Sequence, residues 1–179
     1  MYRPSSEHSL TPEAPSSQLH AIPSGVAGTL ATLKIMWLLV KQGKISVPVR
    51  LKAVSLTNHL LQKDYRAEIE AIHRFVRDEI RYVRDINGVE TLHGAEWLLR
   101  QGAGDCDDKS VLMAAMLESI GFRTRLVAIG FHPGRYCHVF IEVKLGKNWA
   151  PLEATEPVEA GWKFPLNPPL RMIYPPMPT

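Results

Sequence analysis

The sequence predicts one α+β domain, with helices in the first half of the chain and antiparallel strands in the second. Two observations predict this order. Before Gly121, apolar residues recur at spacings of three and four, which is the period of a helix that buries one face. After Gly121, apolar and polar residues tend to alternate, which is the period of a half-buried strand. Helices followed by strands are typical of the α+β class.

The composition fits a single folded unit with a proline-rich segment at either end. A chain of 179 residues, 45% hydrophobic and 22% charged, is long enough to bury a core. Residues 1–24 are rich in serine and proline and predict an irregular tail, whereas residues 165–179 are rich in proline and predict an extended arm. The domain between them covers residues 25–164, with a helical segment at 25–63 and a core at 65–158.

Five helices are predicted, and glycines close three of them. The predicted ranges are 25–42, 48–63, 65–83, 91–101 and 106–120. The third helix has the clearest apolar stripe, which consists of Ile69, Ile72, Val76, Ile80 and Val83. Gly43, Gly102 and Gly121 mark helix ends, and a left-handed cap is expected at Gly102. The pair Asn87-Gly88 predicts a turn. The inward face of the last helix should consist of Val111, Leu112, Ala115, Met116 and Ile120.

Three strands are predicted in the second half of the chain. The predicted ranges are 123–131, 136–144 and 148–155. Successive side chains of a strand point to opposite faces, so His138, Phe140 and Glu142 share one face of the middle strand. Cys137 points to the other face, and we expect it to be a small buried hydrophobic residue.

The chemistry of the chain centres on Cys106, in the sequence Gly-Ala-Gly-Asp-Cys-Asp-Asp at residues 102–108. The thiol is predicted at the first turn of a helix, where unpaired N–H groups and the helix dipole favour the thiolate. Asp105 is well placed to cap that helix. The carboxylates of Asp105, Asp107 and Asp108 disfavour the thiolate. The attraction between an imidazolium and a thiolate about 4 Å apart is worth roughly 4 kcal/mol at an effective dielectric of 20. This attraction would outweigh the opposing effect of the carboxylates, provided that they cap N–H groups or point outward.

A histidine and an acid that can complete this site lie on the predicted strands. Glu142 shares the face of His138 but lies roughly 13 Å along the same strand, which is too far for contact. Glu153 lies on the next strand. A hairpin that turns on residues 145–146 places Glu153 opposite His138, and a turn on residues 146–147 makes Glu153 the diagonal neighbour. The loop must be even-numbered, because an odd loop would move Glu153 to the opposite face.

Four separated motifs occur in an order that resembles the transglutaminase-like superfamily. They are Gly-Asp-Cys-Asp-Asp-Lys-Ser, Ser-Ile-Gly-Phe-Arg-Thr-Arg-Leu-Val, His-Val-Phe-Ile-Glu-Val and Trp-Ala-Pro-Leu-Glu-Ala-Thr. The resemblance covers roughly residues 65–158 and implies a papain-like fold, with Cys106 as nucleophile, His138 as base and Glu153 as acid. The family usually has aspartate in the acid position. The resemblance also implies an oxyanion hole made by the Cys106 backbone N–H and an upstream donor. Trp97 is a candidate for that donor, but we expect it to pack in the core.

The resemblance implies cysteine-dependent amide chemistry through a thioester intermediate. Hydrolysis of a peptide or protein amide is favoured over transfer to an amine, because transfer needs a dry pocket for the amine and nothing in the sequence identifies one. Cys106 is expected to alkylate before Cys137, because only Cys106 combines a helix start with a histidine.

An alternative function comes from a second resemblance. The short chain with proline-rich ends resembles transglutaminase-like proteins carried by bacteriophages and prophages. The protein would then be a structural or adaptor component of a phage particle, with residues 1–24 and 165–179 docking onto other phage proteins. Wrapping of these segments around their own domain is the other possibility.

Other partners and cofactors are not supported. A net charge of +3 without a basic stripe argues against nucleic acid. His59, His73 and His93 lack metal-ligand spacing and no glycine-rich phosphate loop occurs, so neither metal nor cofactor is expected. Two cysteines cannot form a disulfide framework, which favours a bacterial cytoplasm or a phage particle assembled there. The apolar stretch at residues 25–40 contains Lys34 and is too short to cross a membrane, so no membrane partner is expected.

Overall fold

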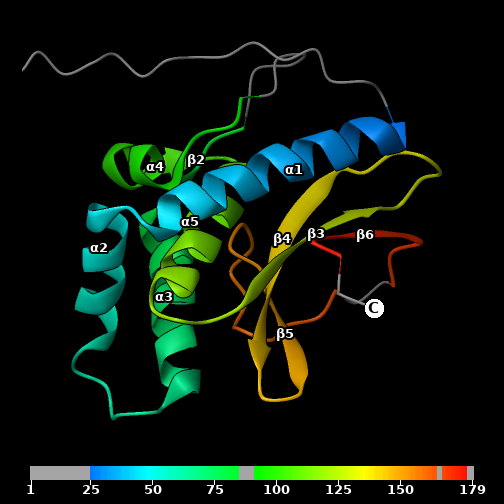
Figure 1. The fold of residues 1–179 in the computed structure, drawn as a ribbon. Coiled ribbons are helices and arrows are strands. Elements are labelled where there is room, and N and C mark those ends of the chain that lie inside the picture. The colour runs from blue at the N-terminus through cyan, green and yellow to red at the C-terminus, as the bar shows by residue number, and fades with distance from the viewer. Residues whose placement is uncertain (1–24, 85–90, 165–166, 177–179) are drawn as a thin grey trace, which may run out of the picture.

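The computed structural model of the protein describes residues 25–84, 91–164 and 167–176. Within these ranges the chain forms five helices and a four-stranded sheet; four of the helices gather on one side of the sheet, and the first helix runs across the top of both (Figure 1). This arrangement confirms the predicted α+β class. The predicted tail at residues 1–24 and the predicted turn at Asn87-Gly88 lie outside the described residues.

The five predicted helices are all present. They are α1 (Gly25–Lys44), α2 (Val47–Thr57), α3 (Tyr65–Glu79), α4 (Ala95–Gln101) and α5 (Cys106–Ser119). Pro48 lies in the first turn of α2, where its missing N–H would have no helical partner anyway. Asp64 caps α3 by accepting a hydrogen bond from the backbone N–H of Ala67. The left-handed cap predicted at Gly102 is confirmed, with a φ of 68°.

Several helix ends differ from the predictions. Helix α2 stops before the predicted residue 63, and α3 stops early enough to leave Val83 exposed, so its buried stripe ends at Ile80. Helix α1 continues through Gly43 because this glycine is a packing contact. A Cβ on Gly43 would lie 2.6 Å from the Cβ of Ala95 and 2.8 Å from the Cβ of Ala115. The missing side chain therefore lets α1 approach α4 and α5 closely.

Helix α5 lies at the centre of the molecule. All of its residues except Cys106 are buried, and it contacts the other four helices as well as the four-stranded sheet. The sequence predicted one inward face, but the opposite face is covered too, because helices pack on one side and strands on the other. The polar side chains of α5 must therefore find their partners inside the protein. None of the helices in the described residues is both long and apolar enough to cross a membrane.

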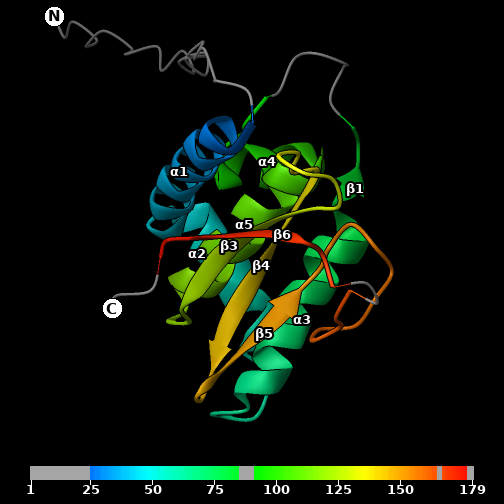
Figure 2. The same ribbon diagram turned by 90° about the vertical axis from the view of Figure 1, so that its right-hand side faces the viewer.

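The four-stranded sheet is antiparallel, in the order β5-β4-β3-β6. Its strands are β3 (Thr124–Gly130), β4 (His138–Leu145), β5 (Asn148–Leu152) and β6 (Leu170–Tyr174). The first three confirm the predicted strands, with ends that differ by up to three residues. Strand β6 pairs with β3 (Figure 2), so this stretch packs on its own domain, which is the other possibility that the sequence left open. Pro169 and Pro175 flank β6, which occupies the proline-free residues between them.

Two further features of the strands position the site. Strand β5 is an edge strand, and it accommodates Pro151, opposite Glu142 of β4, because an edge strand can lack an N–H donor. A separate two-stranded sheet pairs β1 (Arg81–Tyr82) in parallel with β2 (Ala103–Gly104). This pair joins the segment after α3 to the segment that leads into Cys106.

Gly43→Ala should lower the free energy of unfolding by about 1–3 kcal/mol, because the added methyl group overpacks the junction of α1 with α4 and α5. Urea denaturation measures the change. Gly94→Ala is the control for a methyl group in open space, because a Cβ on Gly94 would meet nothing within 4 Å; as the N-cap of α4 it should lose only about 0.5–1 kcal/mol. A Gly43→Ala variant as stable as wild type would show that Gly43 is not a close-packing residue.

Candidate active site

Cys106 is the first residue of α5, as the sequence predicts. The Asp105 carboxylate accepts hydrogen bonds from the backbone N–H groups of Asp107 and Asp108, at 3.0 and 3.1 Å, which confirms it as the helix cap. The preceding residues are held by the parallel pairing of β1 with β2. The thiol is therefore placed by a capped helix start whose incoming chain is also anchored.

The thiol is half-buried, and its surroundings favour the protonated form. Burial raises the pKa of Cys106, and the charges of Asp107 and Asp105 raise it further, although a backbone hydrogen bond with Val139 acts in the opposite direction. The thiol donates a hydrogen bond to Oδ1 of Asp107 at 3.4 Å. The Asp107 side chain is buried beside the sulfur, so it does not meet the condition that the carboxylates cap N–H groups or point outward. At rest Cys106 is a thiol, and a base must remove its proton before it can attack.

His138 and Glu153 are in direct contact. Nε2 of His138 and Oε2 of Glu153 lie 2.6 Å apart. The other carboxylate oxygen of Glu153 accepts hydrogen bonds from the backbone N–H and the hydroxyl of Thr155, both at 2.7 Å. Burial alone would raise the pKa of Glu153, but the hydrogen bonds from His138 and Thr155 lower it below its ordinary value. Glu153 is thus a fixed, ionised acid that holds one nitrogen of the imidazole.

The hairpin between β4 and β5 explains this contact. Leu145 pairs with Asn148, so the loop consists of the two residues Gly146 and Lys147, and the predicted even-numbered loop is confirmed. Of the two turns left open by the sequence, the structure has the one that makes Glu153 the diagonal neighbour of His138. Because the diagonal separation is longer than the direct one, the longer side chain of glutamate fits this register.

The start of β4 also packs against the start of α5. The sulfur of Cys106 is hydrogen-bonded to the backbone of Val139, the residue after His138. One turn further along α5, the hydroxyl of Ser110 donates to the carbonyl of Val139 at 3.4 Å. Cys106 and His138 therefore belong to two elements that contact each other at the start of α5. Since Nε2 of His138 is bound to Glu153, Nδ1 is the ring nitrogen left for the thiol.

Cys137 does not have the predicted environment. It is exposed rather than buried, because β4 begins at His138 and Cys137 belongs to the preceding loop. The expectation that Cys106 alkylates first is therefore reversed. Cys137 is open to solvent, whereas Cys106 is half-buried and has a raised pKa.

A second pair of a histidine and an acid, His93 and Asp108, involves helix α5. Both oxygens of the Asp108 carboxylate accept from His93, one from its backbone N–H at 2.9 Å and one from Nδ1 at 3.0 Å. The His93 ring stacks on Trp97 with centroids 3.7 Å apart, and Trp97 packs against the core as expected. Asp108 thus ties the segment before α4 to α5. The sequence gives no signal for this pair, since His93 lies fifteen residues upstream of Asp108 in a different element.

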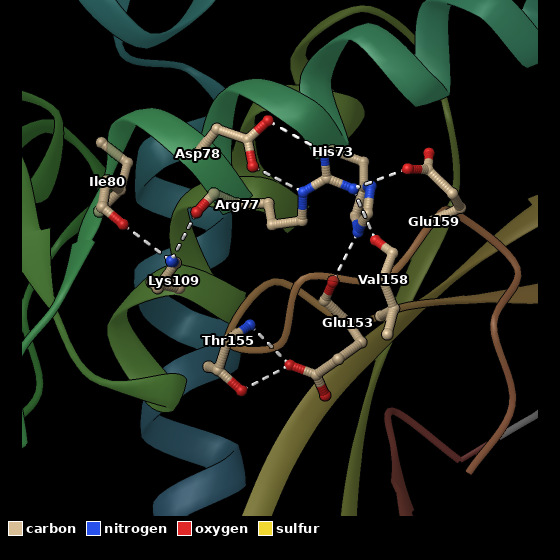
Figure 3. A network of polar contacts seen from close by, with 9 residues as sticks. All are labelled: His73, Arg77, Asp78, Ile80, Lys109, Glu153, Thr155, Val158 and Glu159. Carbon is tan, nitrogen blue, oxygen red and sulfur yellow. Dashed lines mark hydrogen bonds and ion pairs between the residues drawn. The ribbon is translucent and has the colours of Figure 1, made fainter. Parts of the chain in front are cut away.

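Behind Glu153 lies a polar network that the sequence analysis did not find (Figure 3). His73 of α3 contacts the backbone carbonyl of Glu153, and Lys109 of α5 contacts the end of α3. The sequence feature that could have indicated this network is Lys109, because a lysine on a predicted core helix needs a polar partner. Among the described residues, no group of three histidine, cysteine or acidic side chains is arranged to hold a metal ion.

A family model described as the transglutaminase-like superfamily matches residues 54–154, which is more than half of the chain. The chain belongs to this superfamily. The matched range includes Cys106, His138 and Glu153. No curated protein sequence matches the chain.

One of the solved structures that align with this chain does so with a TM-score above 0.5 and shares its fold. A candidate protease from Parabacteroides distasonis aligns with a TM-score of 0.56 at 15% identity, over 69% of this chain and 26% of that one. A candidate cysteine protease from Cytophaga hutchinsonii gives a TM-score of 0.49 at 18% identity, over 60% and 37% of the two chains. Calcium-bound LapG from Legionella pneumophila gives a TM-score of 0.47 at 16% identity, over 68% of this chain and 73% of that one. The transglutaminase-like domain thus spans well under half of the length of the first two proteins.

Asp107→Asn should lower the pKa of the Cys106 thiol, because it removes the negative charge closest to the sulfur. A decrease of one pKa unit raises the thiolate fraction tenfold below the pKa, so iodoacetamide labelling at pH 8 should accelerate by roughly that factor. The measurement uses a Cys137→Ser background and peptide mass spectrometry. Asp64→Asn, at the start of α3, is the control that should leave the rate unchanged. A rate unaltered by Asp107→Asn would contradict this assignment of the thiol environment.

Proposed function

We propose that the protein is a cysteine hydrolase that cleaves amide bonds in peptides or proteins, with Cys106 as nucleophile, His138 as general base and Glu153 as orienting acid. The observation that carries the proposal is the 2.6 Å contact between His138 and the buried carboxylate of Glu153. This pair lies at the start of the strand against which the Cys106 sulfur packs. A thiol, a base and a group that orients the base are the parts of a covalent catalytic site.

The first half of the reaction forms a thioester. Nδ1 of His138 accepts the thiol proton while Sγ of Cys106 attacks the carbonyl carbon of the amide. The resulting oxyanion lies at the start of α5, where the backbone N–H of Cys106 can donate to it. Nδ1 then gives its proton to the amide nitrogen as the C–N bond breaks, and the amine leaves.

The second half of the reaction restores the enzyme. Water attacks the thioester carbon, and Nδ1 of His138 accepts the proton that the water loses. The C–S bond breaks to give the carboxylic acid, and the proton returns to the Cys106 sulfur. The His138 side chain is 19% exposed, so water can reach it, which favours hydrolysis over transfer to an amine.

The charge of Glu153 supports both halves. Each half passes through an imidazolium, and an ionised carboxylate at hydrogen-bond distance stabilises that cation. This support is needed because the resting thiol is neutral, so the ion pair forms during the reaction. The hydrogen bonds from Thr155 keep the carboxylate ionised and oriented.

The test of this function is a peptide library screened with wild type and with Cys106→Ala. We expect cleavage by wild type and none by Cys106→Ala, with Cys137→Ala as the matched control that keeps full activity. The screen is repeated with an added primary amine, and hydrolysis products should dominate. Cleavage that survives Cys106→Ala would refute the proposal, and amine-linked products in excess would change it to a transferase.

Glu153→Gln should lower kcat by roughly a hundredfold or more, because the neutral amide no longer stabilises the imidazolium. Glu153→Asp keeps the charge but shortens the reach by one methylene, so its loss should be smaller. Steady-state kinetics on a cleaved peptide, with melting temperatures as a check on folding, distinguish the two effects. A Gln variant as active as the Asp variant would show that the charge of Glu153 has no catalytic role.

A further inference from the structure

The segment that carries Glu153 is bound to one face of α3. His73 and Arg77 lie four residues apart on this helix and therefore point the same way. Nε2 of His73 lies 2.5 Å from the carbonyl oxygen of Glu153, and Nη1 of Arg77 donates to the carbonyl of Val158 at 2.7 Å (Figure 3). Two successive turns of α3 thus bind the segment that follows β5, at Glu153 and at Val158.

The protonation of His73 follows from its partner. A carbonyl oxygen only accepts hydrogen bonds, so Nε2 of His73 carries the proton and donates it. The ring is 1% exposed, and burial lowers its pKa, which keeps it neutral. His73 is therefore a neutral donor inside the protein, bound to the backbone of the residue whose side chain holds His138.

Lys109 joins the same helix to the nucleophile. It lies three residues after Cys106 on α5 and is 2% exposed. Its Nζ donates to the carbonyl of Ile80 at 2.8 Å and to that of Arg77 at 3.3 Å, which are carbonyls left open at the end of α3. Burial lowers the pKa of Lys109 to about 8, while the charge of Glu153 acts in the opposite direction. At neutral pH a buried ammonium thus lies between the two helices and is attracted by the acid.

We propose that His73 and Lys109 are positioning residues of the active site, which fix the acid and the nucleophile helix to α3 as a common frame. His73 holds the backbone of Glu153 so that its carboxylate meets His138. Lys109 holds the first turns of α5 against the end of α3. The effect on turnover rests on the proposed hydrolase function, but the effect on Glu153 does not.

The cost of this arrangement argues for a role beyond packing. Burying an ammonium and an imidazole costs desolvation free energy that their hydrogen bonds only offset, so apolar side chains of similar volume would stabilise the fold at least as well. Both donate to backbone carbonyls close to the site, and neither contacts His138 or Cys106 in the hydrogen bonds of the structure. They can therefore act on the triad only through the placement and charge of Glu153 and α5.

The first test measures the Glu153 carboxyl directly. The full chain is labelled with ¹³C at the glutamate carboxyl carbon and titrated by NMR, with the Glu153 signal assigned by Glu153→Gln. In His73→Leu the pKa of Glu153 should rise by about 1, because the displaced backbone weakens the hydrogen bonds that stabilise the carboxylate. His73→Gln, which offers an amide N–H in place of Nε2, should restore most of the wild-type value. Arg74→Met, which removes an exposed charge from the neighbouring residue of α3, is the matched control and should leave this pKa unchanged.

The same titration is applied to Lys109. Lys109→Met removes both hydrogen bonds to the end of α3, so the frame that holds Glu153 should loosen and its pKa should rise, whereas Lys109→Arg keeps donors there and should preserve it. On a peptide that wild type cleaves, His73→Leu and Lys109→Met should lower kcat by about tenfold to a hundredfold with KM little changed, as expected for a misplaced catalytic group. The conservative variants should recover turnover.

The outcomes separate the two proposals. Folded His73→Leu and Lys109→Met variants with the wild-type pKa of Glu153 and wild-type kcat would overturn the positioning role. If His73→Leu does not fold, His73→Asn, whose shorter side chain withdraws the donor from the carbonyl, replaces it with the same expected result. If wild type cleaves no peptide, the hydrolase function fails, and the Glu153 titrations still decide whether His73 and Lys109 position the acid.

Discussion

The complete burial of α5 is the constraint on which the rest of the structure depends. A helix with neighbours on every side must satisfy its polar residues internally, and each of these contacts ties α5 to a different element. Asp108 binds His93, Lys109 binds the end of α3, and Glu118 binds Lys41 and Lys44 of α1. Only Cys106, at the first turn, reaches beyond the core. The position of the sulfur is thus set by the whole domain and not by one loop.

A neutral resting thiol gives this site a particular chemical character. The helix start favours a thiolate, but burial and the adjacent carboxylate of Asp107 oppose it more strongly, and the pKa of Cys106 is raised. Such a sulfur reacts slowly with electrophiles and oxidants that meet it by chance. In the proposed reaction it would become a nucleophile only when a bound substrate brings the carbonyl and the imidazole into line. Selectivity would then come from geometry rather than from intrinsic reactivity.

Local patterns predicted those parts of the site that depend on local geometry. The helix start at Cys106, its Asp105 cap and the reach from His138 to Glu153 all follow from period, turn length and side-chain face. The exposure of Cys137 and the inward turn of Asp107 could not be predicted, because they depend on where a strand begins and on which neighbours cover a helix. Strand β6 was hidden by its flanking prolines, which make a short proline-free stretch look like part of an arm. The contacts of His73 and Lys109 join residues 80 and 29 positions apart, so no local pattern reveals them.

Pro151 has a consequence for how these molecules behave together. It lies in β5, an outer strand of the sheet, and supplies no N–H there. An extended chain that paired with this edge strand would lack one backbone hydrogen bond at Pro151. The proline therefore acts as a gatekeeper against edge-to-edge aggregation at high concentration, on the side of the sheet next to the hairpin that brings Glu153 to His138.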